Sequence, residues 1–172
     1  MKMDDFGRYH MRRQDRAMPE RADHLDVVRG GKYLTLALSR DNQPYLVTLC
    51  YAFAEDENCF YVHCATSGKK LDFIRANQRV WGQVLEDHGY AVGRGTYHYR
   101  TVMFDALAEP VDEPEVKARA LLAMLERYEP EPEPLTAKMM VKGMVDRTAV
   151  LRLRVVAMSG KQNRPEPPPA AT

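Results

Sequence analysis

Between positions 33 and 65, three strand-type segments follow one another with only short turns between them. Residues 33–38 alternate apolar and polar side chains, and residues 45–53 and 59–65 are rich in β-branched and aromatic side chains. The two segments that separate them, 41–44 and 55–58, carry the Asp, Asn, Pro and Glu residues of turns. Few folds are compatible with this pattern. It predicts a meander of three antiparallel strands.

The rest of the chain adds strands and helices of ordinary length. Alternating or β-branched stretches predict three more strands, over residues 80–85, 95–108 and 147–158. Helical spacing of apolar residues and flanking Pro or Gly predict four helices, over residues 19–29, 68–77, 114–128 and 135–144. Six strands with helices between them favour a mainly β fold with peripheral helices (α+β), arranged as a small antiparallel barrel.

We expect one folded domain with a segment outside its core at each end. The chain has 172 residues, a length typical of a single domain. Residues 1–17 are polar and rich in Arg, which predicts a solvated N-terminal arm. Residues 161–172 are rich in Pro and Ala, which predicts a disordered tail. The domain itself is predicted over residues 18–160.

The charge balance argues against partners that are recognised by net charge. Lys and Arg total 25 against 24 Asp and Glu, and a net charge of +1 provides no field to attract nucleic acid or an anionic membrane. No apolar run approaches the roughly 20 residues that span a bilayer, and the first residues lack the apolar stretch of a secretory signal. Three cysteines without framework spacing are typical of reduced thiols. We expect a cytoplasmic protein that binds neither nucleic acid nor membrane.

A short segment that begins at Thr66, Thr-Ser-Gly-Lys-Lys-Leu-Asp, combines a predicted helix start with two adjacent cations. Thr66 or Ser67 is a natural N-cap after a strand. Lys69 and Lys70 then fall in the first helical turn, where the helix dipole disfavours a cation by up to about 1 kcal/mol. A bound phosphate reverses that sign, because free N–H groups, the dipole and both ammonium groups would face it. The alternative is that both lysines are merely solvated, with Asp72 compensating their charge.

His63 lies deep in a predicted apolar strand, next to Cys64 and four residues after Cys59. On a strand, Cys59 and His63 share a face but lie about 13 Å apart, and His63 and Cys64 point to opposite faces. Bonds from zinc to its ligands are only about 2.0–2.3 Å long, so neither pair can close around a zinc ion. We expect no metal site. His63 is then either a half-buried packing residue or a proton donor, because histidine titrates near neutrality.

Other polar clusters have plain interpretations. Residues 97–100, Tyr-His-Tyr-Arg, could stack on bases or on a flavin, or form one cross-strand aromatic pair on a barrel. The near-neutral net charge weighs against a site for single-stranded nucleic acid. Arg119 and Arg127 are predicted on the exposed face of the helix over 114–128 and need no function.

Several segments, in the same order, resemble one protein family. The longest covers residues 60–77, where a strand, a His, a Gly-Lys-Lys turn and an Asn-ended helix follow one another. Shorter matching segments cover residues 11–16, 31–38, 44–48 and 97–102. The chain resembles the flavin-binding proteins related to pyridoxamine 5′-phosphate oxidase and, within them, the 5-nitroimidazole-resistance branch. The resemblance spans about residues 11–158.

This resemblance implies an FMN-binding split β-barrel that forms a homodimer, with flavin in clefts between the subunits. Lys69 and Lys70 correspond by position to the basic pair that meets the flavin phosphate. His63 and Cys64 fall beside the isoalloxazine and ribityl chain, and His63 matches the residue thought to act on substrate in the nitroimidazole branch. Further flavin contacts are implied for Val47, Thr48, Leu49 and Cys50 on one strand and for Arg100 and Thr101 on another.

One implied contact strand departs from the family pattern. The nitroimidazole-resistance branch commonly has Pro-Val-Asn where this chain has Thr48-Leu49-Cys50. The predicted function is an FMN-dependent oxidoreductase that reduces a small organic acceptor, such as a nitroaromatic compound, with NAD(P)H or another donor supplying electrons. The alternative is a split barrel that binds flavin, haem or deazaflavin without turnover.

Overall fold

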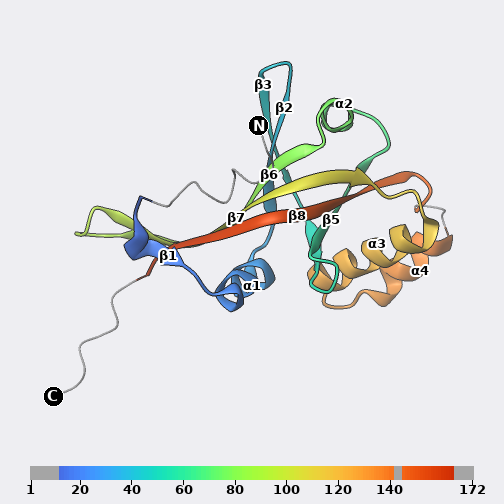
Figure 1. The fold of residues 1–172 in the computed structure, drawn as a ribbon. Helices are drawn as coiled ribbons and strands as arrows, with labels where there is room; N and C mark the ends of the chain where they lie inside the picture. The colour runs from blue at the N-terminus through green and yellow to red at the C-terminus, as the bar shows by residue number, and fades with distance from the viewer. Residues whose placement is uncertain (1–11, 142–144, 165–172) are drawn as a thin grey trace.

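The computed structural model describes residues 12–141 and 145–164, and these form an antiparallel sheet with helices around it (Figure 1). The strands are β1 Ala17–Met18, β2 Leu34–Arg40, β3 Gln43–Leu49, β4 Tyr51–Ala54, β5 Cys59–Ala65, β6 Arg79–Ala91, β7 Thr96–Pro110 and β8 Thr148–Asn163. The helices are α1 Arg21–Gly30, α2 Lys69–Ala76, α3 Pro114–Tyr128 and α4 Glu133–Val141. None of these described helices is long and apolar enough to cross a membrane.

The sheet is a split barrel, as the sequence predicts. Its strands are hydrogen-bonded in the order β3-β2-β6-β7-β8-β5-β4, and β1 pairs with β8. The β2–β3 hairpin stands steeply across the long β7 and β8 strands in Figure 1. The two outermost strands, β3 and β4, are consecutive in the chain yet lie at opposite ends of this order. The sheet is therefore curled but not closed by hydrogen bonds.

Cys50 connects the two edge strands of the sheet, β3 and β4. We predicted one strand over 45–53, but the structure divides it into β3 and β4 at Cys50. Leu49 pairs with Leu34 in β2, whereas Tyr51 pairs with Val62 in β5. One continuous strand cannot keep both pairings, so the chain leaves one edge of the sheet and enters the other at this residue.

Two apolar layers cover the two faces of β4, β5 and β8. On β5, Phe60 and Val62 pack into the barrel interior, whereas Cys59 and Tyr61 pack on the other side with Leu121 and other residues of α3. This follows from the period of two along a strand. Within the interior, Phe104 stacks on Phe60 with ring centroids 4.3 Å apart. The side of β5 that carries Phe60 and Val62 therefore faces the barrel interior, and the side that carries Cys59 and Tyr61 faces α3.

The β6–β7 hairpin and the end of β8 are longer than predicted. The polar segment 86–94, expected between two strands, lies mostly within β6, and the hairpin projects beyond the rest of the sheet (Figure 1). β8 continues to Asn163, so residues 161–163 extend a strand rather than begin a tail. Ala17 likewise pairs with Lys161 instead of ending the arm. These polar ends become strands because neighbouring strands satisfy their backbone groups. Residues 1–11 and 165–172 and the end of the predicted 135–144 helix lie outside the described residues.

The position of the Arg127 side chain shows that one prediction about α3 is wrong. It was expected on the exposed face, but its guanidinium lies 4.3 Å from the centre of the Tyr51 ring. Its Nη2 donates toward the carbonyl oxygens of Val28 at 2.9 Å and Gly31 at 2.6 Å, at the end of α1. Apolar spacing placed Arg127 off the core-facing stripe, and only the neighbouring α1 gives it partners. Arg119, in contrast, lies exposed and forms an ion pair with Glu57 at 3.0 Å.

Candidate functional site

The start of α2 is open to a ligand. The N-cap is Gly68, with a φ of 128°, and not Thr66 or Ser67 as predicted. In the described part of the chain, no side chain caps this helix start. A Cβ built on Gly68 would meet no atom within 4 Å. The positive φ explains why glycine suits this position, and the uncapped start leaves the first-turn N–H groups available to an anion.

The two lysines of this turn have different surroundings. The Lys69 ammonium lies 4.5 Å from the centre of the Tyr45 ring and 5.4 Å from that of Phe73. Lys70 is half-buried, and its positive charge acts on His63 and Cys64. Lys70 therefore connects the helix start with the end of β5, whereas Lys69 packs on the edge of the barrel.

His63 and Cys64 face different layers, as predicted for neighbours on a strand. Cys64 packs against the barrel interior, as do Val47 and Leu49 of β3. Burial raises the pKa of the Cys64 thiol, which keeps it protonated. His63 faces α3 and keeps part of its surface exposed, because it lines an open cavity. Burial lowers the pKa of its imidazole, and the charge of Lys70 lowers it further. His63 is therefore neutral at pH 7.

A cavity of about 280 Å³ lies between the end of β5 and α3. His63 and Cys50 line it together, which brings two of the predicted site residues to one place. Sequence reasoning missed the remaining lining residues, because the apolar spacing of α3 indicates only ordinary core packing. These are Leu121, Met124, Leu125, Tyr128, Glu129 and Thr148.

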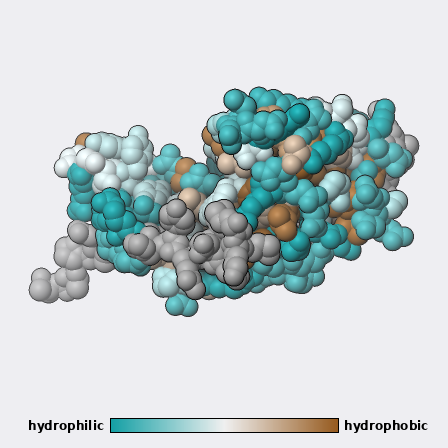
Figure 2. All heavy atoms as spheres, turned by 45° about the horizontal axis from the view of Figure 1, so that its top comes forward, coloured by the Kyte–Doolittle hydropathy of each residue, from teal (hydrophilic) through white to brown (hydrophobic). Residues whose placement is uncertain are grey.

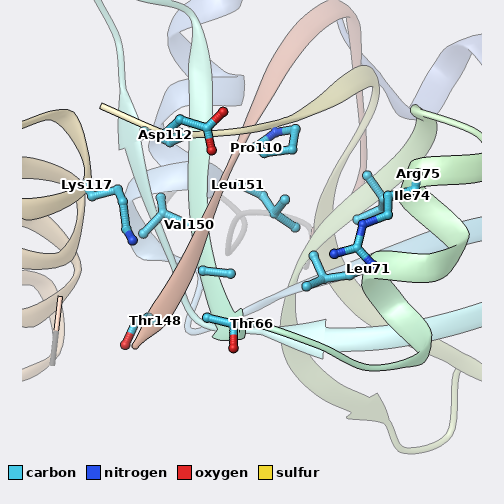
Figure 3. A pocket seen from close by; sticks show the side chains of 12 residues that line it. Thr66, Leu71, Ile74, Arg75, Pro110, Asp112, Lys117, Thr148, Val150 and Leu151 are labelled. Carbon is cyan, nitrogen blue, oxygen red and sulfur yellow. The ribbon is translucent and has the colours of Figure 1, made fainter. Parts of the chain in front are cut away.

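A second cavity, of about 230 Å³, lies on the α2 side of the same strand ends (Figure 3). Thr66 and Thr148 lie at its lower edge in Figure 3, and Arg75 and Lys117 enter it from opposite sides. Thr148 borders both cavities. The paired ends of β5 and β8 therefore separate a mixed-charge hollow beside α2 from a mostly apolar one beside α3.

The β3 residues divide between the two sides of the strand. Val47 and Leu49 point inward, whereas Thr48 and Cys50, the residue directly after β3, are exposed. The Thr48 hydroxyl lies 3.3 Å from that of Thr35 on β2. The exposed side of β3 therefore ends next to Cys50, which lines the cavity beside α3 together with His63.

Arg100 and Thr101 do not join this cluster within one chain. On β8, Val150 pairs with His63 and Gln162 pairs with Arg100. Those twelve positions correspond to roughly 40 Å of strand. The Arg100 guanidinium lies near carboxylates of Asp23, at 3.7 Å, and Glu86, at 3.6 Å.

Thr101 also lies away from this cluster. It is buried, and its hydroxyl donates a hydrogen bond to the carbonyl oxygen of Val84. In the described residues, no group of three or more His, Cys, Asp or Glu is placed to hold a metal ion.

Comparisons with known proteins agree with this fold. A family model described as pyridoxamine 5′-phosphate oxidase matches residues 20–162. A search of curated proteins finds no match. A conserved hypothetical protein from Mycobacterium tuberculosis is 25% identical, with 95% of this chain and 99% of that chain covered and a TM-score of 0.72.

Two further solved structures share the fold at lower identity. A FAD-binding protein from Mesorhizobium loti is 24% identical, with coverage of 86% and 97% and a TM-score of 0.61. A putative 5-nitroimidazole antibiotic resistance protein from Bacteroides thetaiotaomicron is 16% identical, with coverage of 85% and 86% and a TM-score of 0.71.

Proposed function

The chain belongs to the pyridoxamine 5′-phosphate oxidase family, and from this we propose that it binds FMN beside α2 and uses it to reduce a small organic acceptor. The observation that carries the proposal is the uncapped start of α2 at Gly68, next to Lys70 and His63. Open space at Gly68 lets a phosphate approach the backbone closely. The residues present therefore fit the phosphate end of FMN.

Each residue has a distinct role in this proposal. Lys69 and Lys70 hold the phosphate, together with the N–H groups of the first turn of α2. The exposed edge of β3 at Thr48 and Cys50 supports the ring system. When bound, the flavin supplies the electron-transfer chemistry, and the protein binds and orients it. His63, neutral at pH 7, donates a hydrogen bond from its ring N–H to the acceptor.

We propose that the protein acts as a homodimer. Ala37 pairs with Leu46 on one side and Trp81 on the other, so these side chains form a row on the outer face of the sheet. Leu46 is 67% exposed and Trp81 40% exposed. Exposed apolar rows of this kind are typical of interfaces.

The first prediction tests the phosphate contact. We expect Lys69→Ala and Lys70→Ala each to weaken FMN binding about tenfold or more, because each removes a cation from the phosphate, and tenfold corresponds to about 1.4 kcal/mol. Flavin fluorescence quenching measures the affinity. Riboflavin, which lacks the phosphate, provides the matched ligand, and its affinity should stay constant. Lys138→Ala on α4 is the matched protein control. Equal loss of FMN and riboflavin binding would place the lysines outside a phosphate site.

The second prediction tests His63. We expect His63→Ala to bind FMN with little change and to lose at least tenfold in kcat for an acceptor, because the imidazole hydrogen-bonds to the acceptor and does not hold the cofactor. Stopped-flow reduction and reoxidation separate the two half-reactions. Only the step that consumes the acceptor should slow. An unchanged rate would leave His63 as a packing residue. A haem Soret band in place of flavin bands in the purified protein would favour the non-flavin alternative.

A further inference from the structure

The apolar layer between the sheet and α3 stops before the strands do. Tyr61 of β5 and Val150 of β8 belong to that layer. The next outward-facing positions on the same strands are His63 and Thr148, and they line the cavity of about 280 Å³. Cys50 borders it at the step between β3 and β4. Polar groups on one wall therefore face an apolar helix across a space that no described side chain fills.

The opposite wall is held in place by packing and hydrogen bonds. Leu121 and Met124 are buried in the layer beneath α3 and also line the cavity. The backbone N–H of Tyr51 donates to the Tyr128 hydroxyl at 3.1 Å, and Arg127 fixes the end of α3 to the end of α1. A wall fixed at both its core side and its end forms the cavity before any ligand arrives, which lowers the entropic cost of binding.

The charges around the cavity favour an uncharged ligand. Among its lining residues, all of which are described, Glu129 is the only carboxylate and no lysine or arginine is present. Glu129 lies at one end and disfavours an anion. The nearby positive charge of Lys70, which acts on His63, disfavours a cation beside the imidazole. His63 offers a hydrogen bond, and the four α3 side chains offer apolar contact.

We propose that this cavity binds a small, uncharged, predominantly apolar ring compound, which contacts His63 on one side and Leu125 and Met124 of α3 on the other. A volume of about 280 Å³ lies below the range of drug-sized pockets, so one or two fused rings fill it. Its assignment as the acceptor site rests on the proposed flavin function, whereas binding itself requires no flavin. Leu125 and Met124 then determine which acceptors reach His63.

Two ligands of equal shape test the charge preference. 2-Naphthamide is neutral and 2-naphthoate is an anion, and both carry the same fused rings. We expect 2-naphthamide to bind the flavin-free protein at least tenfold more tightly, measured by naphthyl fluorescence or calorimetry. The His63 imidazole signals should shift in the NMR spectrum on titration. Equal or tighter binding of 2-naphthoate, or no binding of either compound, would overturn the proposal.

Two substitutions on one helix locate the site. Leu125→Trp fills the cavity and should lower the 2-naphthamide affinity at least tenfold, while thermal unfolding and FMN affinity stay near wild type. Leu122→Trp is the matched control, because Leu122 lies on another side of α3, toward α4. This variant should bind 2-naphthamide as tightly as the wild-type protein does. If both variants lose binding of 2-naphthamide, or if neither does, the ligand does not bind in this cavity.

FMN separates this inference from the proposed function. If FMN binds and displaces 2-naphthamide competitively, the cavity holds the flavin ring and the acceptor assignment is overturned. If FMN and 2-naphthamide bind together, the acceptor assignment is supported. If 2-naphthamide binds as expected but no flavin does, the cavity is confirmed and the proposed flavin function fails.

Discussion

At the scale of single residues, His63 and Cys64 differ because a strand turns neighbours to opposite faces. Cys64 enters the barrel interior, whereas His63 lines the cavity beside α3. The sequence predicts this alternation and the presence of Lys70 nearby. It does not predict that α3 covers the His63 side, since the helix begins about fifty residues later. The low pKa of the imidazole therefore depends on tertiary packing.

The third prediction concerns that pKa. We expect the His63 imidazole to titrate below 6.5 in the folded protein, because burial and then Lys70 disfavour its charged form. At pH values between the folded-state pKa of His63 and 6.5, the unfolded chain binds more protons than the folded one. This group therefore makes the free energy of unfolding rise with pH and fall in acid. NMR titration measures the midpoint. Lys70→Ala should move the midpoint upward, and Lys69→Ala should not. A midpoint at or above 6.5 would contradict the packing described for the ring.

At the scale of elements, α1 and α3 are joined through Arg127, which the sequence pattern assigned to solvent. The last carbonyls of a helix need partners, and Val28 and Gly31 find them in a guanidinium from another helix. The same contact stacks Arg127 on the Tyr51 ring at the start of β4. Three elements therefore meet at one side chain, close to the wall of the α3 cavity.

The fourth prediction measures this junction. We expect Arg127→Met to lower the free energy of unfolding by about 1–3 kcal/mol, because it leaves buried carbonyl groups without a charged donor. Arg119→Met is the control on the same helix. Its ion pair with Glu57 is exposed, and such pairs contribute about 0–1 kcal/mol. Urea denaturation gives both values. Equal effects of the two substitutions would show that Arg127 does not tie α3 to α1.

At the scale of the whole molecule, the predicted flavin contacts fall at two ends of β8. Lys70 and His63 lie at one end, and Arg100 lies at the other. Most of the face shown in Figure 2 is hydrophilic, with apolar atoms gathered in smaller patches. The row of Leu46, Ala37 and Trp81 is an apolar surface that a second copy would cover.

The fifth prediction tests the assembly. We expect the wild-type protein to sediment as a dimer and Trp81→Lys to shift it toward the monomer by at least tenfold in Kd, because a charge in the row would lose its hydration when a second copy covers it. Val92→Lys at the tip of the β6–β7 hairpin is the control, since Val92 is 89% exposed and lies away from the row. A wild-type monomer at micromolar concentration would end the homodimer proposal.

The sequence alone determined what depends on neighbours along the chain. Alternation over 33–38 and 59–65, the turns between them and the apolar spacing over 114–128 indicate strands and a helix, because the periods of two and 3.6 residues are local properties. The Gly-Lys-Lys turn and the family resemblance likewise needed no tertiary information. Only the tertiary structure decided that the predicted 45–53 strand divides at Cys50, which face of β5 is covered by α3 and how far Arg100 lies from His63. These outcomes depend on which distant strands share hydrogen bonds, and no short stretch of sequence records that pairing.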